Sequence, residues 1–169
     1  MASHSSDLAK MKGLIESKNI SQGNGRELII DRASHKTEFD SKQKLLEFCV
    51  HSADVSTQTR SFDIAVEWTK LLFEEFFHQG DIEKDKGLPV SFLCDRETTQ
   101  ISQSQPGFVN FILAPLFAQV SILMPEVAQL EANALENAEK WKIYEETEDF
   151  RQVYIKKTEE ERLQNATTE

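Results

Sequence analysis

Cysteine, long apolar runs and targeting signals are all scarce in this sequence of 169 residues. The 2 Cys, Cys49 and Cys94, are too few for the disulfide framework of a small secreted protein. The longest apolar stretch, residues 111–118, falls well short of the roughly 20 residues that span a bilayer, and it contains Pro115. The N-terminus has neither the basic region nor the apolar core of a signal peptide. We therefore expect a cytoplasmic chain with no transmembrane segment.

Positive charge is scarce as well. The chain has 19 Lys and Arg against 29 Asp and Glu, so its net charge is -10 at pH 7. Binding to nucleic acids requires clustered Lys and Arg that neutralise phosphates, and anionic membranes attract basic segments. The composition argues against both kinds of surface, and we expect no nucleic-acid partner.

What the sequence does contain is apolar residues with a helical period. Hydrophobic residues make up 39% of the chain and 11 residues are Phe, which is enough for the core of one ordinary domain. The clearest pattern begins after Ser61 and runs towards Gly80, where apolar residues form one wide stripe. Further helices are predicted over residues 7–16, after Asp40, and in two or three pieces over residues 97–144. Kinks or breaks are expected at Pro106, Pro115 and Pro125. The predicted fold class is all-α.

Common catalytic signatures do not occur in the sequence. It has no phosphate-binding Gly loop, no CxxC pair, no HExxH and no GxSxG. Four short motifs do occur in one order: H-S-A-D at residues 51–54, W-T at 68–69 leading into E-E-F-F-H-Q-G-D at 74–81, C-D-R at 94–96, and S-Q-P-G-F at 104–108.

The order and spacing of these motifs closely resembles the C-terminal half of the catalytic domain of class I 3',5'-cyclic nucleotide phosphodiesterases. The family pattern there is H-x-A-D, W-T followed by E-E-F-F-x-Q-G-D, C-D-[KR] and S-Q-x-G-F. The resemblance runs from about Met1 to Trp141, where N-A-E-K-W is similar to the family's closing N-x-x-x-W. Residues 1–144 are therefore predicted to be a partial phosphodiesterase-like catalytic domain. Residues 145–169, with 8 acidic and 4 basic side chains, are predicted to be an acidic tail in which a helix frays to disorder.

The resemblance implies a fold, a reaction and roles for six residues. The family's HD-like fold is a multi-helix bundle with two divalent metals, usually zinc and magnesium, and a metal-bridging hydroxide opens the cyclic phosphate of cAMP or cGMP to a 5'-nucleotide. By position, Asp54 matches a metal ligand, Gln105 the Gln that hydrogen-bonds the purine edge, and Phe108 the Phe that stacks on the purine. Leu72 and Phe73 match apolar residues that line the family's base pocket. Trp68 matches a residue near the mouth of that pocket.

Elementary chemistry agrees with these roles and leaves alternatives open. An amide donates and accepts at once, so it can meet a purine edge in more than one orientation. Gln105 and Phe108, at i and i+3, share one helix face, as a clamp on a base requires. Asp54 could equally be a helix-end carboxylate with no metal, and Gln105 could bridge a kinked helix. Phe108, Phe73 and Trp68 could be plain core aromatic residues.

The sequence also departs from the family pattern. The motifs of the family's N-terminal half, H-N-x-x-H, H-D and H-D-x-x-H-P-G, do not occur. Those motifs supply three of the four metal ligands and the His that protonates the leaving group, so no catalytic residue is assigned here. One carboxylate cannot hold a dinuclear centre, because a divalent ion takes roughly four to six ligands. We expect this chain alone to bind no metal and to be inactive. Thr57 stands where the family often has an Asn that touches the base.

Two hypotheses about function follow from these observations. In the first, the chain is half of a phosphodiesterase, and its function is hydrolysis of cyclic nucleotides once the His-rich half is present. In the second, it is a non-catalytic, phosphodiesterase-derived subunit with a structural or interaction role in a larger assembly. A half bundle leaves apolar helix faces uncovered. Both hypotheses therefore predict a protein partner or an oligomer.

Overall fold

The computed structural model describes residue 9, residues 12–13 and residues 37–156. The elements of the last range are α3 (Thr37–Asp54), η1 (Ser56–Thr59), α4 (Phe62–Asp85), α5 (Ile101–Phe108), η2 (Val109–Leu113), α6 (Ala114–Leu123), η3 (Pro125–Val127), α7 (Ala128–Lys142), α8 (Glu148–Arg151) and η4 (Gln152–Tyr154). No strand occurs in these described ranges, which confirms the predicted all-α class. The helix expected over residues 7–16 lies almost entirely outside them.

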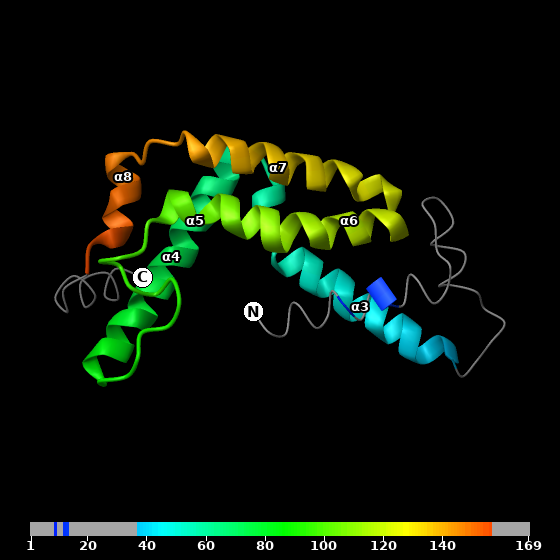
Figure 1. Cartoon of the computed structure of the whole chain (residues 1–169), viewed down its shortest axis with the longest axis horizontal. Coiled ribbons are helices and arrows are strands. Elements are labelled where there is room, and N and C mark those ends of the chain that lie inside the picture. The colour runs from blue at the N-terminus through cyan, green and yellow to red at the C-terminus, as the bar shows by residue number, and fades with distance from the viewer. Residues whose placement is uncertain (1–8, 10–11, 14–36, 157–169) are drawn as a thin grey trace, which may run out of the picture.

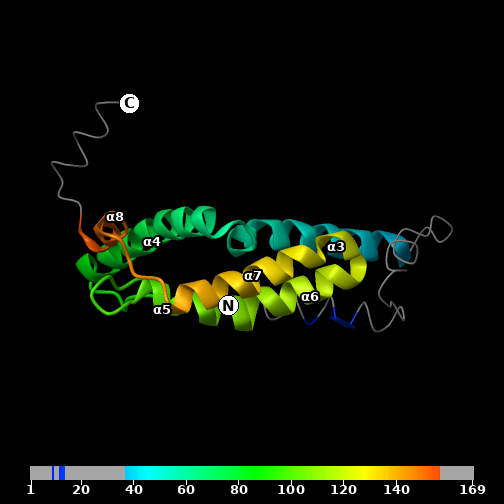
Figure 2. The same cartoon turned by 90° about the horizontal axis from the view of Figure 1, so that it is seen from above.

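The helices form two layers, as Figures 1 and 2 show. In one layer, α5, η2 and α6 follow one another as a single rod, and α7 returns antiparallel along it. In the other layer, α3 and α4 diverge from η1. Because η1 contacts α3, α4 and α7, this short turn joins the two layers.

Two clusters of buried side chains hold the layers together. The first cluster, between α3, the rod and α7, consists of Phe48, Val109, Leu113, Leu116, Phe117, Val120, Leu123, Ala134 and Ala138. The second cluster, between α4, the start of α5, the end of α7 and the C-terminal residues, consists of Val66, Phe73, Phe77, Ile101, Trp141, Phe150 and Val153.

The three prolines at which kinks or breaks were expected have different effects on the helices. Pro125 begins η3 after Met124 leaves the helical conformation, so a break occurs there as expected. Pro106 lies inside α5, and Pro115 lies at the start of α6, directly after the π-helical turn η2. Proline lacks the N–H that a regular helix would donate. The wider π turn accommodates this loss, so the rod continues through Pro115.

Gly80 permits a close approach between α4 and the loop that follows it. A Cβ atom at this position would lie 1.9 Å from the carbonyl oxygen of Cys94, so a larger residue would push the loop away. Gly87 ends the helix in the left-handed region, with φ at 67°. Its N–H and that of Leu88 donate to the carbonyls of Lys84 and Glu83, which is a common helix C-terminus.

Residues 145–156, which we call the C-terminal strap, fold against α4 and the start of α5 (Figure 1). Phe150 and Val153 are buried in the second cluster, and Lys70 on α4 pairs with Asp149. This part of the predicted acidic tail therefore belongs to the core. Residues 157–169 lie outside the described residues.

The rod is also the most apolar helical stretch of the described chain. Ile101–Leu123 is long and apolar enough to cross a membrane by length and composition alone, although no run in the sequence had suggested a span. A core helix passes the same test. Val109, Leu113 and Leu116 are buried in the first cluster, which is how a core helix packs.

Candidate functional site

Gln58 lies at the centre of a buried set of hydrogen bonds that joins four elements. The side chain is 1% exposed. Its Oε1 accepts from the indole Nε1 of Trp141 at 2.8 Å. Its Nε2 donates to Thr69 Oγ1 at 2.8 Å and to Gln105 Oε1 at 3.2 Å. An indole N–H can only donate, so it fixes the Gln58 oxygen towards Trp141 and the amide nitrogen towards Gln105.

Gln105 is therefore fixed at the oxygen of its amide. At the other end, its Nε2 donates to Ser104 Oγ at 3.0 Å, and Ser104 Oγ donates to the carbonyl of Ile101 at 2.6 Å. The second N–H of the amide has no hydrogen-bond partner among residues 37–156. The side chain is 5% exposed. The amide thus bridges α5 to η1, and these contacts use only one of its two N–H groups.

The N-x-x-x-W motif on α7 holds this arrangement in place. Asn137 Nδ2 donates to the carbonyls of Gln58 and Arg60, each at 2.8 Å. Trp141, one turn later on α7, binds the Gln58 side chain. Asn137 therefore binds the backbone at the end of η1, and Trp141 binds the side chain of Gln58 in the same turn.

Asp54, the matched metal ligand, is the last residue of α3 and is exposed. Within the described ranges, no group of three or more His, Cys, Asp or Glu side chains could hold a metal ion. A divalent ion takes roughly four to six ligands. The described residues therefore do not fit the family's pair of metals by themselves.

The predicted aromatic and apolar site residues lie in different surroundings. Phe108 is partly buried and packs against the first cluster. Phe73 is 1% exposed and belongs to the second cluster, where its ring meets Phe76 and Phe77. Trp68 is 54% exposed and Leu72 is 43% exposed on α4. Phe108 and Phe73 thus belong to different clusters, while Trp68 and Leu72 lie on the exposed side of α4.

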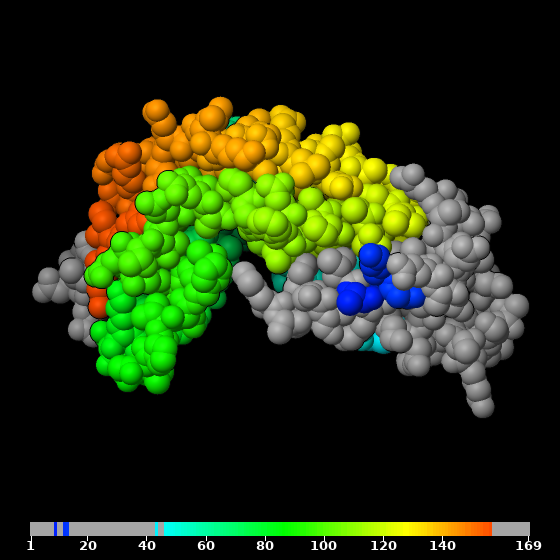
Figure 3. Space-filling view, viewed as in Figure 1, coloured from blue at the N-terminus to red at the C-terminus, as the bar shows by residue number. Residues whose placement is uncertain are grey.

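The surface of the molecule is hollowed below α5, beside α4 and the loop that follows it (Figure 3). An open pocket lies on that loop and is lined by residues 90–93, 95 and 98–100. None of the six predicted site residues lines it.

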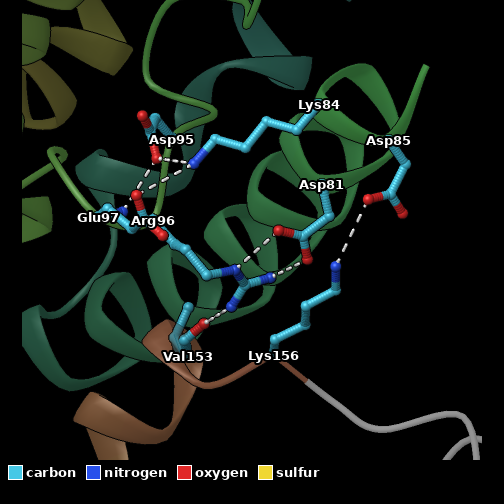
Figure 4. Close-up of polar contacts among 8 residues, drawn as sticks. All are labelled: Asp81, Lys84, Asp85, Asp95, Arg96, Glu97, Val153 and Lys156. Atoms are coloured by element: carbon cyan, nitrogen blue, oxygen red, sulfur yellow. Dashed lines mark hydrogen bonds and ion pairs between the residues drawn. The ribbon is translucent and has the colours of Figure 1, made fainter. Parts of the chain in front are cut away.

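The motifs Q-G-D and C-D-R meet in an ion pair rather than in the candidate site (Figure 4). Arg96 binds both carboxylate oxygens of Asp81, with Nη2 at 2.7 Å and Nε at 3.1 Å. Its Nη1 donates to the carbonyl of Val153 at 3.2 Å, which ties the C-terminal strap to α4. Beside this pair, a hydrogen bond from Lys84 lowers the pKa of the Asp95 carboxyl. These motif residues have a structural role in the described chain.

Sequence reasoning missed Gln58 and Thr69. Gln58 lies in a short polar segment between two predicted helices, which predicts a turn but not a buried amide. Its partners Thr69, Gln105 and Trp141 lie 11, 47 and 83 positions further along the chain, so no local sequence pattern predicts these hydrogen bonds.

Comparison with known proteins agrees with this fold and these motifs. A family model described as 3'5'-cyclic nucleotide phosphodiesterase matches residues 1–135. The chain belongs to the 3',5'-cyclic nucleotide phosphodiesterase family, as the motifs predicted.

Two curated relatives illustrate the similarity. A dual specificity calcium/calmodulin-dependent 3',5'-cyclic nucleotide phosphodiesterase 1B from Bos taurus is 46% identical over 86 residues, which are 51% of this chain and 16% of the relative. The probable 3',5'-cyclic-AMP phosphodiesterase pde-4 of Caenorhabditis elegans is 32% identical over 141 residues, which are 83% of this chain and 20% of the relative. The chain therefore spans no more than about a fifth of either relative.

Solved structures show the same partial coverage. LmjPDEB1 in complex with IBMX matches with a TM-score of 0.69 and 26% identity, over 85% of this chain and 39% of that structure. The phosphodiesterase domain of the Salpingoeca rosetta rhodopsin phosphodiesterase matches with a TM-score of 0.66, over 100% of this chain and 44% of that structure. At 23% identity, the second match concerns the fold alone.

Proposed function

We propose that this chain supplies the purine-recognising half of a cyclic nucleotide phosphodiesterase domain. It takes part in hydrolysis of cAMP or cGMP to the 5'-nucleotide only when a His-rich, metal-binding half completes the domain. The observation that carries the proposal is the buried amide of Gln105, held by Gln58 and Ser104 with one N–H remaining. In the complete domain, zinc and magnesium supply water activation and charge neutralisation.

Three of the six matched residues have a defined task in this proposal. Gln105 donates to the purine edge, and a net hydrogen bond of this kind contributes ~0.5–1.5 kcal/mol. Phe108 stacks on the base, which contributes ~1–3 kcal/mol. Asp54, exposed at the end of α3, donates a carboxylate to ions whose other ligands come from the completing half.

The exposed apolar residues of α4 support the need for a completing partner. Ile64, Trp68, Leu71 and Leu72 recur at helical spacing and are all exposed. An exposed apolar face of this kind commonly marks an interaction surface. We propose that the completing half of the domain covers it.

Reconstitution tests the proposal. The full chain alone, with zinc and magnesium, should hydrolyse neither cAMP nor cGMP. Adding the N-terminal half of a relative's catalytic domain as a separate polypeptide should produce turnover. Gln105→Ala should then lower kcat/KM, whereas Gln103→Ala, on the exposed side of α5, should not. Asp54→Ala should abolish turnover, and Asp63→Ala, also exposed, is its matched control.

Two results would contradict the proposal. One is turnover by the lone chain that disappears with Asp54→Ala. The other is a reconstituted enzyme that is indifferent to Gln105→Ala.

A second candidate is a non-catalytic subunit with a structural or interaction role. It is favoured by the isolation of Asp54 from other metal ligands within the described ranges. This role predicts a stable complex with the added half but no turnover with either nucleotide.

A further inference from the structure

The start of α5 is held by side chains that lie far away in the sequence. The N–H of Ile101 donates to Tyr154 Oη at 2.9 Å, and the N–H of Ser102 donates to Glu146 Oε1 at 3.3 Å. Tyr154 Oη in turn donates to the same Glu146 oxygen at 3.2 Å. The first N–H groups of a helix have no partner within the helix, and a carboxylate complements the positive end of the helix dipole. No side chain of the adjoining residue Gln100 caps this helix.

These contacts continue directly to the candidate site. Gln105 Nε2 donates to Ser104 Oγ, and Ser104 Oγ donates to the carbonyl of Ile101. The carbonyl of Ile101 and the N–H of Ser102 belong to one peptide group, and this N–H donates to Glu146 Oε1. Tyr154 Oη donates to the same oxygen. Every donor in this series faces the carboxylate end, and hydrogen bonds aligned in this way strengthen one another.

On the η1 side of the Gln105 amide, the hydrogen bonds require the same orientation of the amide. Trp141 donates to Gln58, and Gln58 donates to the Gln105 oxygen. Both sides therefore impose the same orientation on the Gln105 amide, with its oxygen towards η1 and one N–H towards Ser104.

The C-terminal strap that carries Glu146 and Tyr154 is also held by elements other than α5. Phe150 and Val153 are buried in the second cluster, and Arg96 binds the carbonyl of Val153. The Tyr154 ring lies 5.4 Å from that of Phe77 on α4. The strap lies beyond residues 1–135, the part that matches the family model.

We propose that Glu146 and Tyr154 are positioning residues, which hold the start of α5 and thereby fix the orientation of the Gln105 amide for purine recognition. The part of this inference that concerns the purine rests on the proposed function. The part that concerns the amide rests on the contacts alone.

The test uses the full chain without nucleotide or partner, labelled with nitrogen-15. Nuclear magnetic resonance follows the exchange of the Ile101 and Ser102 amide protons with solvent, and the side-chain NH2 resonances of Gln105. Tyr154→Phe removes the phenol oxygen and keeps the ring, and Glu146→Ala removes the carboxylate. For both variants we expect exchange at the start of α5 to rise about fivefold, as for one lost hydrogen bond, and the Gln105 resonances to move.

Two further variants serve as controls. Glu146→Gln keeps an acceptor oxygen and should restore the Gln105 resonances nearly to their original positions. Asp149→Asn changes a residue of the strap that contacts Lys70 on α4, and it should leave both readouts unchanged. If circular dichroism shows that Glu146→Ala does not fold, the near-isosteric Tyr154→Phe and Glu146→Gln decide the question.

Unmoved Gln105 resonances in the folded variants would overturn the positioning role. Equal shifts in Asp149→Asn would overturn it as well, because loss of strap packing would then be the cause.

In the reconstituted enzyme, Tyr154→Phe should raise KM for the cyclic nucleotide about fivefold while kcat changes less. An unchanged KM would overturn the proposal that Tyr154, by positioning Gln105, affects purine recognition. An absence of turnover with every variant, with the resonances moving as expected, would refute the proposed function and confirm the positioning of the amide.

Discussion

Nε2 of Gln58 donates a hydrogen bond to Oε1 of Gln105 at 3.2 Å, across 47 positions of the chain. The Gln58 amide is itself oriented by Trp141 on α7 and Thr69 on α4. The orientation of Gln105 is therefore set by the packing of other elements before any ligand arrives.

Gln58→Leu should destabilise the chain by about 3 kcal/mol. The substitution leaves the buried indole N–H of Trp141 and the Gln105 oxygen without their partner, and a buried unsatisfied polar group costs about 1–3 kcal/mol. Urea unfolding followed by circular dichroism measures the change. Gln79→Leu, on the exposed surface of α4, should change stability by no more than about 0.5 kcal/mol. Similar values for the two variants would refute the buried network.

Gly80→Ala should also destabilise the chain, by about 1–3 kcal/mol. The added Cβ meets the Cys94 carbonyl, so α4 and the following loop must separate. The matched substitution is Gly107→Ala in α5, where a Cβ meets nothing within 4 Å. That variant should gain about 0.5–1 kcal/mol, because alanine favours a helix over glycine. Thermal unfolding of both proteins checks the opposite signs, and a neutral Gly80→Ala would contradict the close approach.

Arg96→Met should release the C-terminal strap and cost about 3–5 kcal/mol. It leaves the nearly buried Asp81 carboxylate without its partner, and an uncompensated buried charge strongly destabilises the folded state. Limited proteolysis should then cut within residues 145–156 faster than in the original chain. The control is Lys156→Met. Lys156 Nζ lies 3.8 Å from Asp85 Oδ1, and both side chains are exposed, so this ion pair contributes little to stability. Equal protection of the strap in both variants would count against this role for Arg96.

Stability should fall at alkaline pH because of Tyr154. Burial raises the pKa of this phenol to about 12. In the unfolded chain the phenol ionises near its usual pKa of about 10. The folded state therefore holds a proton that the unfolded state has lost between these values, and stability decreases as pH rises. The contribution is complete below about pH 10 and is lost as pH approaches 12.

Urea midpoints at pH 9 and pH 11 measure this dependence. Tyr154→Phe should lower the midpoint at pH 9 and should show a smaller decline on going to pH 11. Lysine titration is common to both proteins and cancels in the comparison. An equal decline in the two proteins would mean that Tyr154 is not the responsible group.

The sequence predicted the helices with strong periodicity and the family, because both depend on local patterns. The stripe from Ser61 to Gly80 became α4, which continues to Asp85. The burial of Gln58 was not predictable, because its partners lie on three distant elements. The same limit applies to Phe150 in the strap. Whether Phe150 packs depends on the space that α4 and α7 leave between them.

The candidate site was predicted by residue identity and not by geometry. The motifs located Gln105 correctly on a helix, but they gave no indication that its amide is bound at both ends. They also grouped Phe73 with Trp68, although residues five positions apart on an α-helix lie about 140° apart around its axis. Phe73 lies in the core, and Trp68 lies on the surface.

The π turn at Val109–Leu113 has a consequence for how the rod meets α7. In an ordinary α-helix, residues spaced by four drift about 40° around the axis at each step, so a stripe of that spacing spirals away from a straight neighbour. The wider turn takes back part of this drift. Ile101 and Gln105 before it, Val109 and Leu113 at its two ends, and Leu116 after it can therefore all stay turned towards the interior. Deleting one residue there would restore regular winding and rotate Gln105 out of phase with the half of the rod that packs on α7.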